Sequence, residues 1–146
     1  MIRLGTPDDL DAVRGVYRRA SLSNPTDHDL LLAHPELLVL GPEGLAEGRT
    51  WVAVEDGEVV GFASWTRVGA VLELEDLFVE PRWMRRGVAT ALLTRVADQL
   101  RSEGVARLEV TANPDAMAFY RAMGFTDLGL AWTELGRAPR LALTLG

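Results

Sequence analysis

The sequence contains no cysteine among its 146 residues. This absence excludes a disulfide framework, a thiolate nucleophile and a zinc site with cysteine ligands. No apolar run is long enough to span a bilayer, and the opening stretch MIRLGTPDDLDAV lacks the apolar core of a signal peptide. We therefore expect a cytoplasmic protein that does not attach to membranes.

Histidine is scarce as well, with only His28 and His34 present. Because the two are six positions apart, they neither share a helix face nor form a metal-binding pair. A serine hydrolase site would need one of them, and no nucleophile elbow occurs in the sequence. We expect no bound metal.

The charge balance limits the range of partners. The formal net charge is −6, which argues against general nucleic-acid binding and against attachment to an anionic membrane. It mildly favours amine-bearing, cationic substrates. The length is that of one domain, residues 1–146, able to bury roughly two-thirds of its unfolded surface.

Hydrophobic periodicity and turn residues predict a mixed α/β domain. The expected order of elements is β-αα-βββ-α-β-α-ββ, with residues 35–48 ambiguous. Strands are expected at 2–4, 51–54, 59–65, 71–79, 106–111, 125–130 and 140–145. Helices are expected at 6–20, with a break over 21–26, and at 27–34, 88–103 and 113–123.

The strand at 71–79, VLELEDLFV, changes its alternation halfway along. Leu72 and Leu74 lie on one parity, and Leu77 and Val79 lie on the other. One extra residue near Glu75 would restore the register, which predicts a β-bulge in a central strand. A strand buried on both faces would also lack alternation, so that alternative stays open.

A run without carboxylates follows this strand. Between Glu80 and Asp98 there is no acidic residue, but there are four arginines at positions 82, 85, 86 and 95. Residues 82–87, here called the arginine loop, end at Gly87, where a helical pattern begins. Backbone N–H groups at a helix N-terminus bind phosphate oxygens, so the loop predicts an anion site. A solvated loop is the plainer alternative.

The order of these features resembles the GNAT superfamily of acyl-CoA N-acyltransferases. A bulged strand, the spacing Pro81-x5-Gly87-x-Ala89, a strand followed by Asn113 and the stretch FYRAMGF occur in that order, and the resemblance covers most of the chain. It implies a GNAT-like fold and an acetyl-CoA pyrophosphate bound largely by backbone amides. Met84 stands where the family usually has glutamine or arginine. The cofactor-binding residues implied are Leu77, Phe78, Val79, Met84, Arg85, Arg86, Gly87, Val88, Ala89, Thr90 and Asn113.

Three catalytic residues follow from the same resemblance. Acyl transfer needs a base for the acceptor amine and a proton for the leaving thiolate. Glu73 and Glu75 are the candidates for the base, although each could simply face solvent. Tyr120 is at the family's position for the general acid, although it could instead be a core tyrosine.

The resulting hypothesis is an acetyl-CoA-dependent N-acetyltransferase, of the EC 2.3.1 type, that moves acetyl directly to a primary amine of a small molecule or peptide. Without cysteine, a Cys-acyl intermediate is excluded. By resemblance the acceptor pocket includes the region around 27–29, although an exposed helix start is the favoured interpretation there. The alternatives are a catalytically silent acyl-CoA-binding or regulatory module, and an interaction domain for an acidic partner. The sequence leaves a homodimer open.

Overall fold

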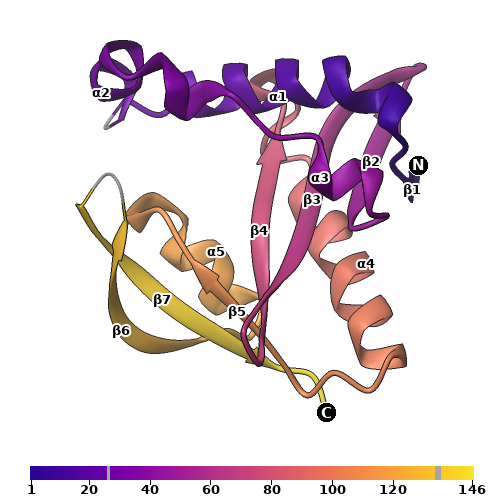
Figure 1. The fold of residues 1–146 in the computed structure, drawn as a ribbon, viewed down its shortest axis with the longest axis vertical. Helices are drawn as coiled ribbons and strands as arrows, with labels where there is room; N and C mark the ends of the chain where they lie inside the picture. Colours follow the sequence, from indigo (N-terminus) through magenta and orange to yellow (C-terminus); the bar gives the residue numbers. More distant parts are fainter. Residues whose placement is uncertain (26, 134–135) are drawn as a thin grey trace. The chain divides into compact units, whose positions relative to one another are not determined.

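The computed structural model describes residues 1–25, 27–133 and 136–146. The strands are β1 (Ile2–Leu4), β2 (Thr50–Glu55), β3 (Glu58–Val68), β4 (Val71–Val79), β5 (Arg107–Thr111), β6 (Thr126–Thr133) and β7 (Gly136–Thr144). The helices are α1 (Leu10–Leu22), α2 (His28–Ala33), α3 (Glu43–Ala46), α4 (Val88–Ser102) and α5 (Met117–Ala122) (Figure 1). The predicted order is confirmed, and the ambiguous segment adds the short helix α3.

The strands follow the order β1-β2-β3-β4-β5-β7-β6 in one seven-stranded sheet. β4 and β5 are parallel, whereas β1–β2, β2–β3, β5–β7 and β6–β7 are antiparallel. The chain forms two compact units, one of Met1–Trp65 with Asp76–Val96 and one of Thr66–Glu75 with Ala97–Gly146. The predicted mixed α/β sheet is therefore confirmed, whereas the assignment of 1–146 to a single domain stays a prediction.

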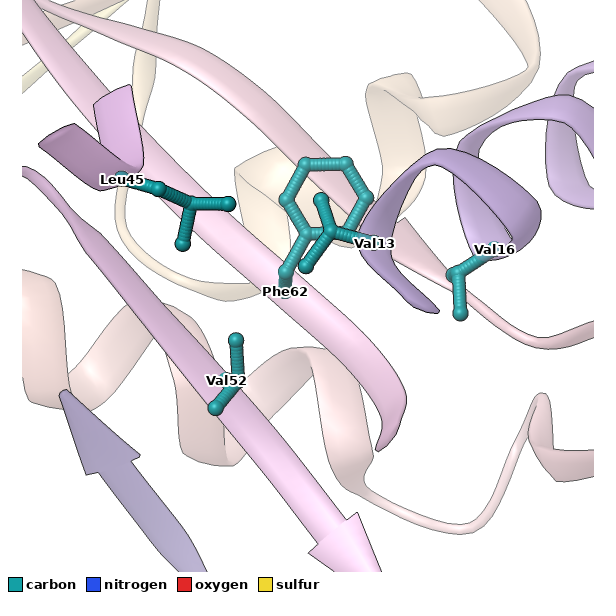
Figure 2. Close-up of a cluster of buried hydrophobic side chains, with 5 residues drawn as sticks. All are labelled: Val13, Val16, Leu45, Val52 and Phe62. Carbon is teal, nitrogen blue, oxygen red and sulfur yellow. The ribbon is translucent and has the colours of Figure 1, made fainter. Parts of the chain in front are cut away.

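In the first unit, β2 and β3 lie between two helices. Val52 and Phe62 on these strands pack against Val13 and Val16 of α1, together with Leu45 of α3 (Figure 2). Successive side chains of a strand point to opposite faces, so the residues next to Phe62 point the other way. On that opposite face, α4 packs closely against β3: a Cβ placed at Gly61 would lie 3.0 Å from Val88 Cγ1 and 3.2 Å from Leu92 Cδ1 of α4.

Local sequence signals decide where this unit begins its helix and its hairpin. The Thr6-Pro7-Asp8-Asp9 start forms a 3-10 turn, Pro7–Asp9, before α1, with a capping box between Thr6 and Asp9. Asp56 and Gly57 have φ of 52° and 78°, the left-handed pair that a tight hairpin between β2 and β3 requires. The helix expected from residue 6 is thus confirmed, and the hairpin joins the two strands expected at 51–54 and 59–65.

Two boundaries differ from the prediction. The break was expected over 21–26, but α1 continues to Leu22, and the N–H of Ser23 donates to carbonyl oxygens in the last turn of the helix. Thr26 lies outside the described residues. β6 and β7 are longer than predicted, because cross-strand pairing extends them to Thr133 and Gly136. Pairing between strands adds residues that local periodicity does not mark.

In the second unit, β4 pairs with β5, β5 with β7, and β7 with β6. The core includes Tyr120 of α5 and Phe125, whose ring centroids lie 5.2 Å apart, and the buried Leu108 and Leu141 of the sheet. The helix expected at 113–123 ends before Gly124, which has a φ of 99°.

The alternation of β4 does change, as predicted. Its buried residues are Leu72 and Leu74 on one parity and Val79 on the other, and Glu75 between them is exposed. Pairing of β4 with β5 covers Leu72 to Leu74, although β4 itself continues to Val79. A bulge as the cause of the change stays a prediction.

Candidate active site

The arginine loop is held at its first end by a buried glutamate. Glu80 directly follows β4 and is bound by Arg19 of α1 through two contacts, Nε to Oε1 at 2.7 Å and Nη2 to Oε2 at 2.9 Å. Hydrogen bonding to this carboxylate raises the pKa of Arg19 above its usual value. The Glu80 N–H also donates to Val60 O of β3 at 2.7 Å. The loop therefore starts from a fixed point.

The other end of the loop is positioned at Gly61 of β3, where the backbone of β4 and the first residue of α4 both come close. A Cβ at Gly61 would lie 3.1 Å from Phe78 O and 3.0 Å from Val88 Cγ1. The end of β4 and the first residue of α4 therefore meet at the same point of β3. A side chain at position 61 would crowd both, so the neighbouring atoms would have to move by a few tenths of an ångström.

At this point α4 presents an open N-terminus. Gly87 O accepts the bond from Ala91 N–H at 3.0 Å, so the N–H groups of Val88, Ala89 and Thr90 form the helix's first turn and have no acceptor within the helix. Gly87 has a φ of 83°, and a Cβ built on it meets no atom within 4 Å. This donor set and the space in front of it fit a phosphate group.

The arginines of the loop differ in their surroundings. Arg82 forms an exposed ion pair with Glu58 at 3.1 Å, and the Arg86 guanidinium lies 5.0 Å from the centre of the Trp83 ring. Arg85 is exposed and has a φ of 62°, a strained conformation for a non-glycine residue. Arg85 and Arg86 are both exposed, and their contact with a bound anion stays a prediction. Met84 is exposed too, so it does not close the site.

The three predicted residues at the end of β4 are not alike. The Phe78 ring packs edge-on to Tyr17 at 4.9 Å and is stacked on Phe62 at 5.8 Å, so its side chain belongs to the core. Val79 is buried and Leu77 half-buried. Ligand contacts at these positions would therefore come chiefly from backbone groups.

Tyr120 lies in the second unit and is 7% exposed. Its ring packs edge-on to Phe119 and Phe125, with centroids 5.2 Å apart in both cases. Burial raises the pKa of the Tyr120 hydroxyl above its usual value of about 10. This hydroxyl forms no hydrogen bond with a described residue. Tyr120 thus combines a core ring with a hydroxyl that is protonated at neutral pH.

Asn113 begins the turn that leads into α5. Its side-chain Oδ1 accepts a bond from Asp115 N–H at 2.9 Å, so Asn113 caps the turn that begins at Pro114. A role in holding the coenzyme stays a prediction.

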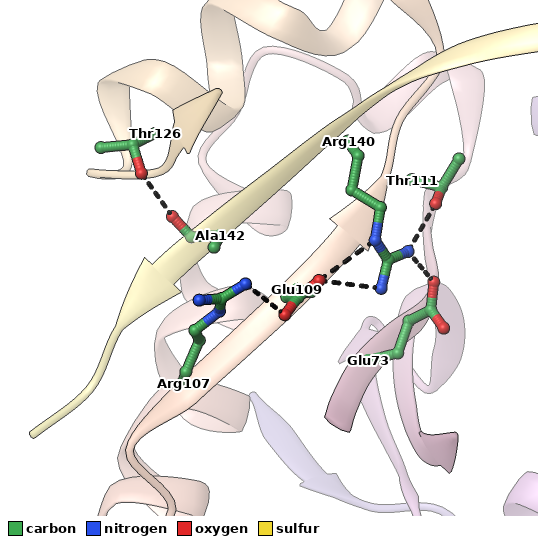
Figure 3. Close-up of polar contacts among 7 residues, drawn as sticks. All are labelled: Glu73, Arg107, Glu109, Thr111, Thr126, Arg140 and Ala142. Atoms are coloured by element: carbon green, nitrogen blue, oxygen red, sulfur yellow. Dashed lines mark hydrogen bonds and ion pairs between the residues drawn. The ribbon is translucent and has the colours of Figure 1, made fainter. Parts of the chain in front are cut away.

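The two candidate bases differ sharply. Glu73 is half-buried, and its Oε1 accepts a bond from Arg140 Nη1 at 2.5 Å (Figure 3). Glu75 is exposed and forms no ion pair or hydrogen bond with another described residue. Arg140 was not recognised from the sequence, where it is one residue of an expected strand. No signal in its neighbourhood marks a partner 67 positions away.

The region around residues 27–29 is polar and exposed. His28 and Asp29 form a surface contact of 3.1 Å, and His34 forms a similar one with Glu36. Among the described residues, no group of three metal-ligating side chains occurs, and no helix is long and apolar enough to cross a membrane.

Comparison with known proteins identifies the family. Residues 13–125 match the sequence model of the acetyltransferase (GNAT) family. The chain is 40% identical over 97 residues to a streptothricin acetyltransferase of Streptomyces lavendulae, covering 62% of this chain and 51% of that protein. It is 34% identical over 98 residues to the peptidyl-lysine N-acetyltransferase YiaC of Escherichia coli (strain K12), covering 65% and 62%. The chain thus spans about half to six-tenths of the length of these curated relatives.

The fold agrees with this match. The PaiA N-acetyltransferase of Thermoplasma acidophilum, in complex with coenzyme A, superimposes with a TM-score of 0.74 at 16% identity, covering 99% of this chain and 98% of that one. The mixed sheet of this chain thus has the same fold as that N-acetyltransferase. This chain belongs to the acetyltransferase (GNAT) family.

Proposed function

We propose that the protein is an acetyl-CoA-dependent N-acetyltransferase that acetylates a primary amine of a small molecule or peptide. The observation that carries the proposal is the open N-terminus of α4 at Gly87, flanked by exposed arginines, in a chain of the GNAT family. The names of two relatives, an acetyltransferase for streptothricin and one for peptidyl-lysine, support acetyl transfer to an amine.

The coenzyme would be held by the residues predicted from the sequence. Free N–H groups of Val88, Ala89 and Thr90 would bind the diphosphate, and Arg85 and Arg86 would add charge. Backbone groups of residues 77–79 would bind the pantetheine arm, with Asn113. When bound, the coenzyme supplies an acetyl group activated as a thioester.

Two proton transfers remain for the chain's own side chains. A carboxylate of β4, Glu73 or Glu75, would accept the proton of the acceptor amine as the new C–N bond forms. The Tyr120 hydroxyl would donate its proton to the sulfur as the C–S bond breaks. Because burial raises the pKa of Tyr120, the hydroxyl carries its proton at neutral pH.

The test has a binding stage and a catalytic stage. Acetyl-CoA at a hundredfold excess over Kd should stabilise the fold by about 2.7 kcal/mol, which raises Tm by roughly 5 to 10 °C. A panel of amines is then assayed for release of free thiol, with product masses measured. An unchanged melt at millimolar acetyl-CoA contradicts the proposal, and coenzyme binding without thiol release for any amine indicates the silent binding module instead.

A further inference from the structure

β6 is an edge strand that carries large exposed apolar side chains. It is the last strand in the sheet order, and among the described strands it pairs with β7 alone. Leu130 and Trp132 of β6 are 64% and 76% exposed. They point to the same face of the sheet, because they are two positions apart on one strand. Apolar side chains that gather on a surface mark a contact with another molecule.

The usual protection of an edge strand is confined to one end of β6. Proteins protect sheet edges with charged side chains, prolines, bulges or very short strands. The register between β6 and β7 shifts between Asp127 and Gly129, as at a β-bulge. Residues 129–133, here called the open edge, then pair with β7 residue by residue. Their sequence, GLAWT, contains no charge and no proline, whereas β1 at the other edge of the sheet has only three residues.

The open edge is complementary to itself in one register. Residues directly opposite each other in an antiparallel pair point to the same face, so a two-fold axis between two such strands must pass through a residue position. Ala131 is the middle residue of the five, and an axis there pairs the whole open edge. Leu130 of each copy then lies opposite Trp132 of the other, and Gly129 lies opposite Thr133. Ala131 meets its own counterpart, and its small side chain leaves room for both.

This register contains favourable pairs and no repulsive one. Aromatic and aliphatic side chains opposite each other stabilise a sheet, whereas like charges opposite each other destabilise it. Each chain has a formal net charge of −6, but the open edge brings no charged residue to the contact. The Arg137 guanidinium lies 4.8 Å from the centre of the Trp132 ring and extends from β7, the strand on the other side of β6.

The expected contact is small. A tryptophan side chain buries about 150 to 250 Å² when it is fully covered. Two tryptophans and two leucines, with the backbone between them, therefore bury less than the roughly 1,200 Å² at which stable interfaces begin. A contact of this size fits a weak, reversible association with a Kd of about 10 µM to 1 mM.

We propose that the open edge of β6 is a dimerisation surface whose partner is a second copy of this chain, paired antiparallel with Leu130 opposite Trp132. The second copy covers the free backbone groups of both open edges at once, so each contact occurs twice and the assembly closes at two copies. The proposal is independent of acetyl transfer, because no residue of the open edge belongs to the proposed coenzyme site.

Sedimentation equilibrium of the full chain tests the association. The parent should show a monomer–dimer equilibrium between about 1 µM and about 1 mM. Leu130→Glu and Trp132→Lys should each weaken it at least about tenfold, because each change breaks the apolar pair at both positions. Leu4→Glu is the matched control, since Leu4 is an exposed leucine on β1, and it should leave Kd unchanged. A parent that stays monomeric at about 1 mM overturns the proposal and leaves the surface to a different protein partner.

A mixture of the two variants tests the register. In a mixed dimer the new carboxylate at position 130 lies opposite the new ammonium group at position 132, and the second Leu130–Trp132 pair is unchanged. The mixture should therefore associate more tightly than either variant alone. A mixture that associates no more tightly than the separate variants contradicts this register.

The absence of cysteine permits a direct test of the two-fold axis. Ala131→Cys places one thiol of each copy at the axis, where opposite Cα atoms of an antiparallel pair lie about 4.5 to 5.5 Å apart, within disulfide range. Mild oxidation should link this variant into dimers on a non-reducing gel, whereas Leu4→Cys should link much more slowly. Thermal unfolding of each reduced variant checks that it is folded. Equal rates of linkage in the two variants would rule out an axis at Ala131.

Discussion

Arg19 and Glu80 form a two-point ion pair that fixes the residue from which the arginine loop starts. The glutamate is buried, whereas more than half of the arginine side chain is exposed. Removing the arginine would therefore leave a buried charge without its partner, which costs more than the pair itself contributes. The pair links the end of α1 to the predicted coenzyme site.

Arg19→Ala should destabilise the protein by about 1 to 3 kcal/mol and weaken acetyl-CoA binding, because the unpaired carboxylate draws the loop toward water. Chemical denaturation and calorimetric titration measure the two effects. Arg18→Ala, one position earlier on an exposed part of α1, is the matched control and should change neither. Equal stability of Arg19→Ala and the parent would show that the pair contributes nothing.

Gly87→Glu should abolish acetyl-CoA binding, because the new side chain brings bulk and negative charge to the open helix N-terminus. Gly104→Glu is the matched control. Gly104 has a φ of 79°, close to that of Gly87, and a Cβ there also meets no atom within 4 Å. Both variants therefore carry similar backbone strain, and only the first should lose binding in a calorimetric titration. Unchanged affinity in Gly87→Glu would place the phosphate site elsewhere.

Arg85→Ala and Arg86→Ala should weaken coenzyme binding by a smaller factor than Gly87→Glu. The loss should be larger at about 20 mM than at about 500 mM salt, because salt screens the attraction between exposed charges. Backbone amides supply the remaining contacts and are less sensitive to salt. The check is Kd measured across a salt series for each variant. Arg82→Ala, whose arginine is paired with Glu58, should show a weaker salt effect than either. Identical salt slopes in all three variants and the parent would remove the arginines from the site.

Tyr120→Phe should lower kcat by about 10²- to 10⁴-fold with little change in acetyl-CoA affinity. The ring and its contacts with Phe119 and Phe125 are kept, and only the proton donor is lost. Tyr17→Phe is the comparison, because that hydroxyl donates to Leu37 O at 2.8 Å and its loss should lower stability by about 1 kcal/mol instead. Normal single-turnover rates in Tyr120→Phe would make Tyr120 a core residue only.

Asp9 predicts a pH dependence of stability. The hydrogen bonds from Arg3 lower the pKa of the Asp9 carboxyl, and the bond from Thr6 N–H acts in the same direction. Since the pKa is lower in the folded than in the unfolded state, the stabilisation is complete above the unfolded value of about 3.9 and is lost as the pH falls through the folded value. Asp9→Asn should therefore be about 1 to 2 kcal/mol less stable at pH 7. The free energies of unfolding of Asp9→Asn and the parent should converge as the pH falls from about 7 to about 2. A difference that stays constant over this range would exclude the ionised Arg3–Asp9 pair as the cause.

Much of the fold could be predicted from the sequence because the signals are local. Helix starts, the Asp56-Gly57 turn and the strand β4 depend on backbone preferences of a few neighbouring residues. The arginine loop was recognisable for the same reason, since its glycine, its arginines and the helix that follows are consecutive. The lengths of β6 and β7 were underestimated because they depend on pairing between strands.

The sequence by itself determined the residue types, their order and the absence of cysteine, and these led to the family and to the two candidate glutamates. Only the tertiary structure decided that Glu73 is bound by Arg140, 67 positions away, and Glu80 by Arg19, 61 positions away. No local pattern encodes such pairs, because the strand register and helix packing that bring them together arise from burial of the core as a whole. The chemical difference between Glu73 and Glu75, two positions apart on one strand, is therefore set by the fold.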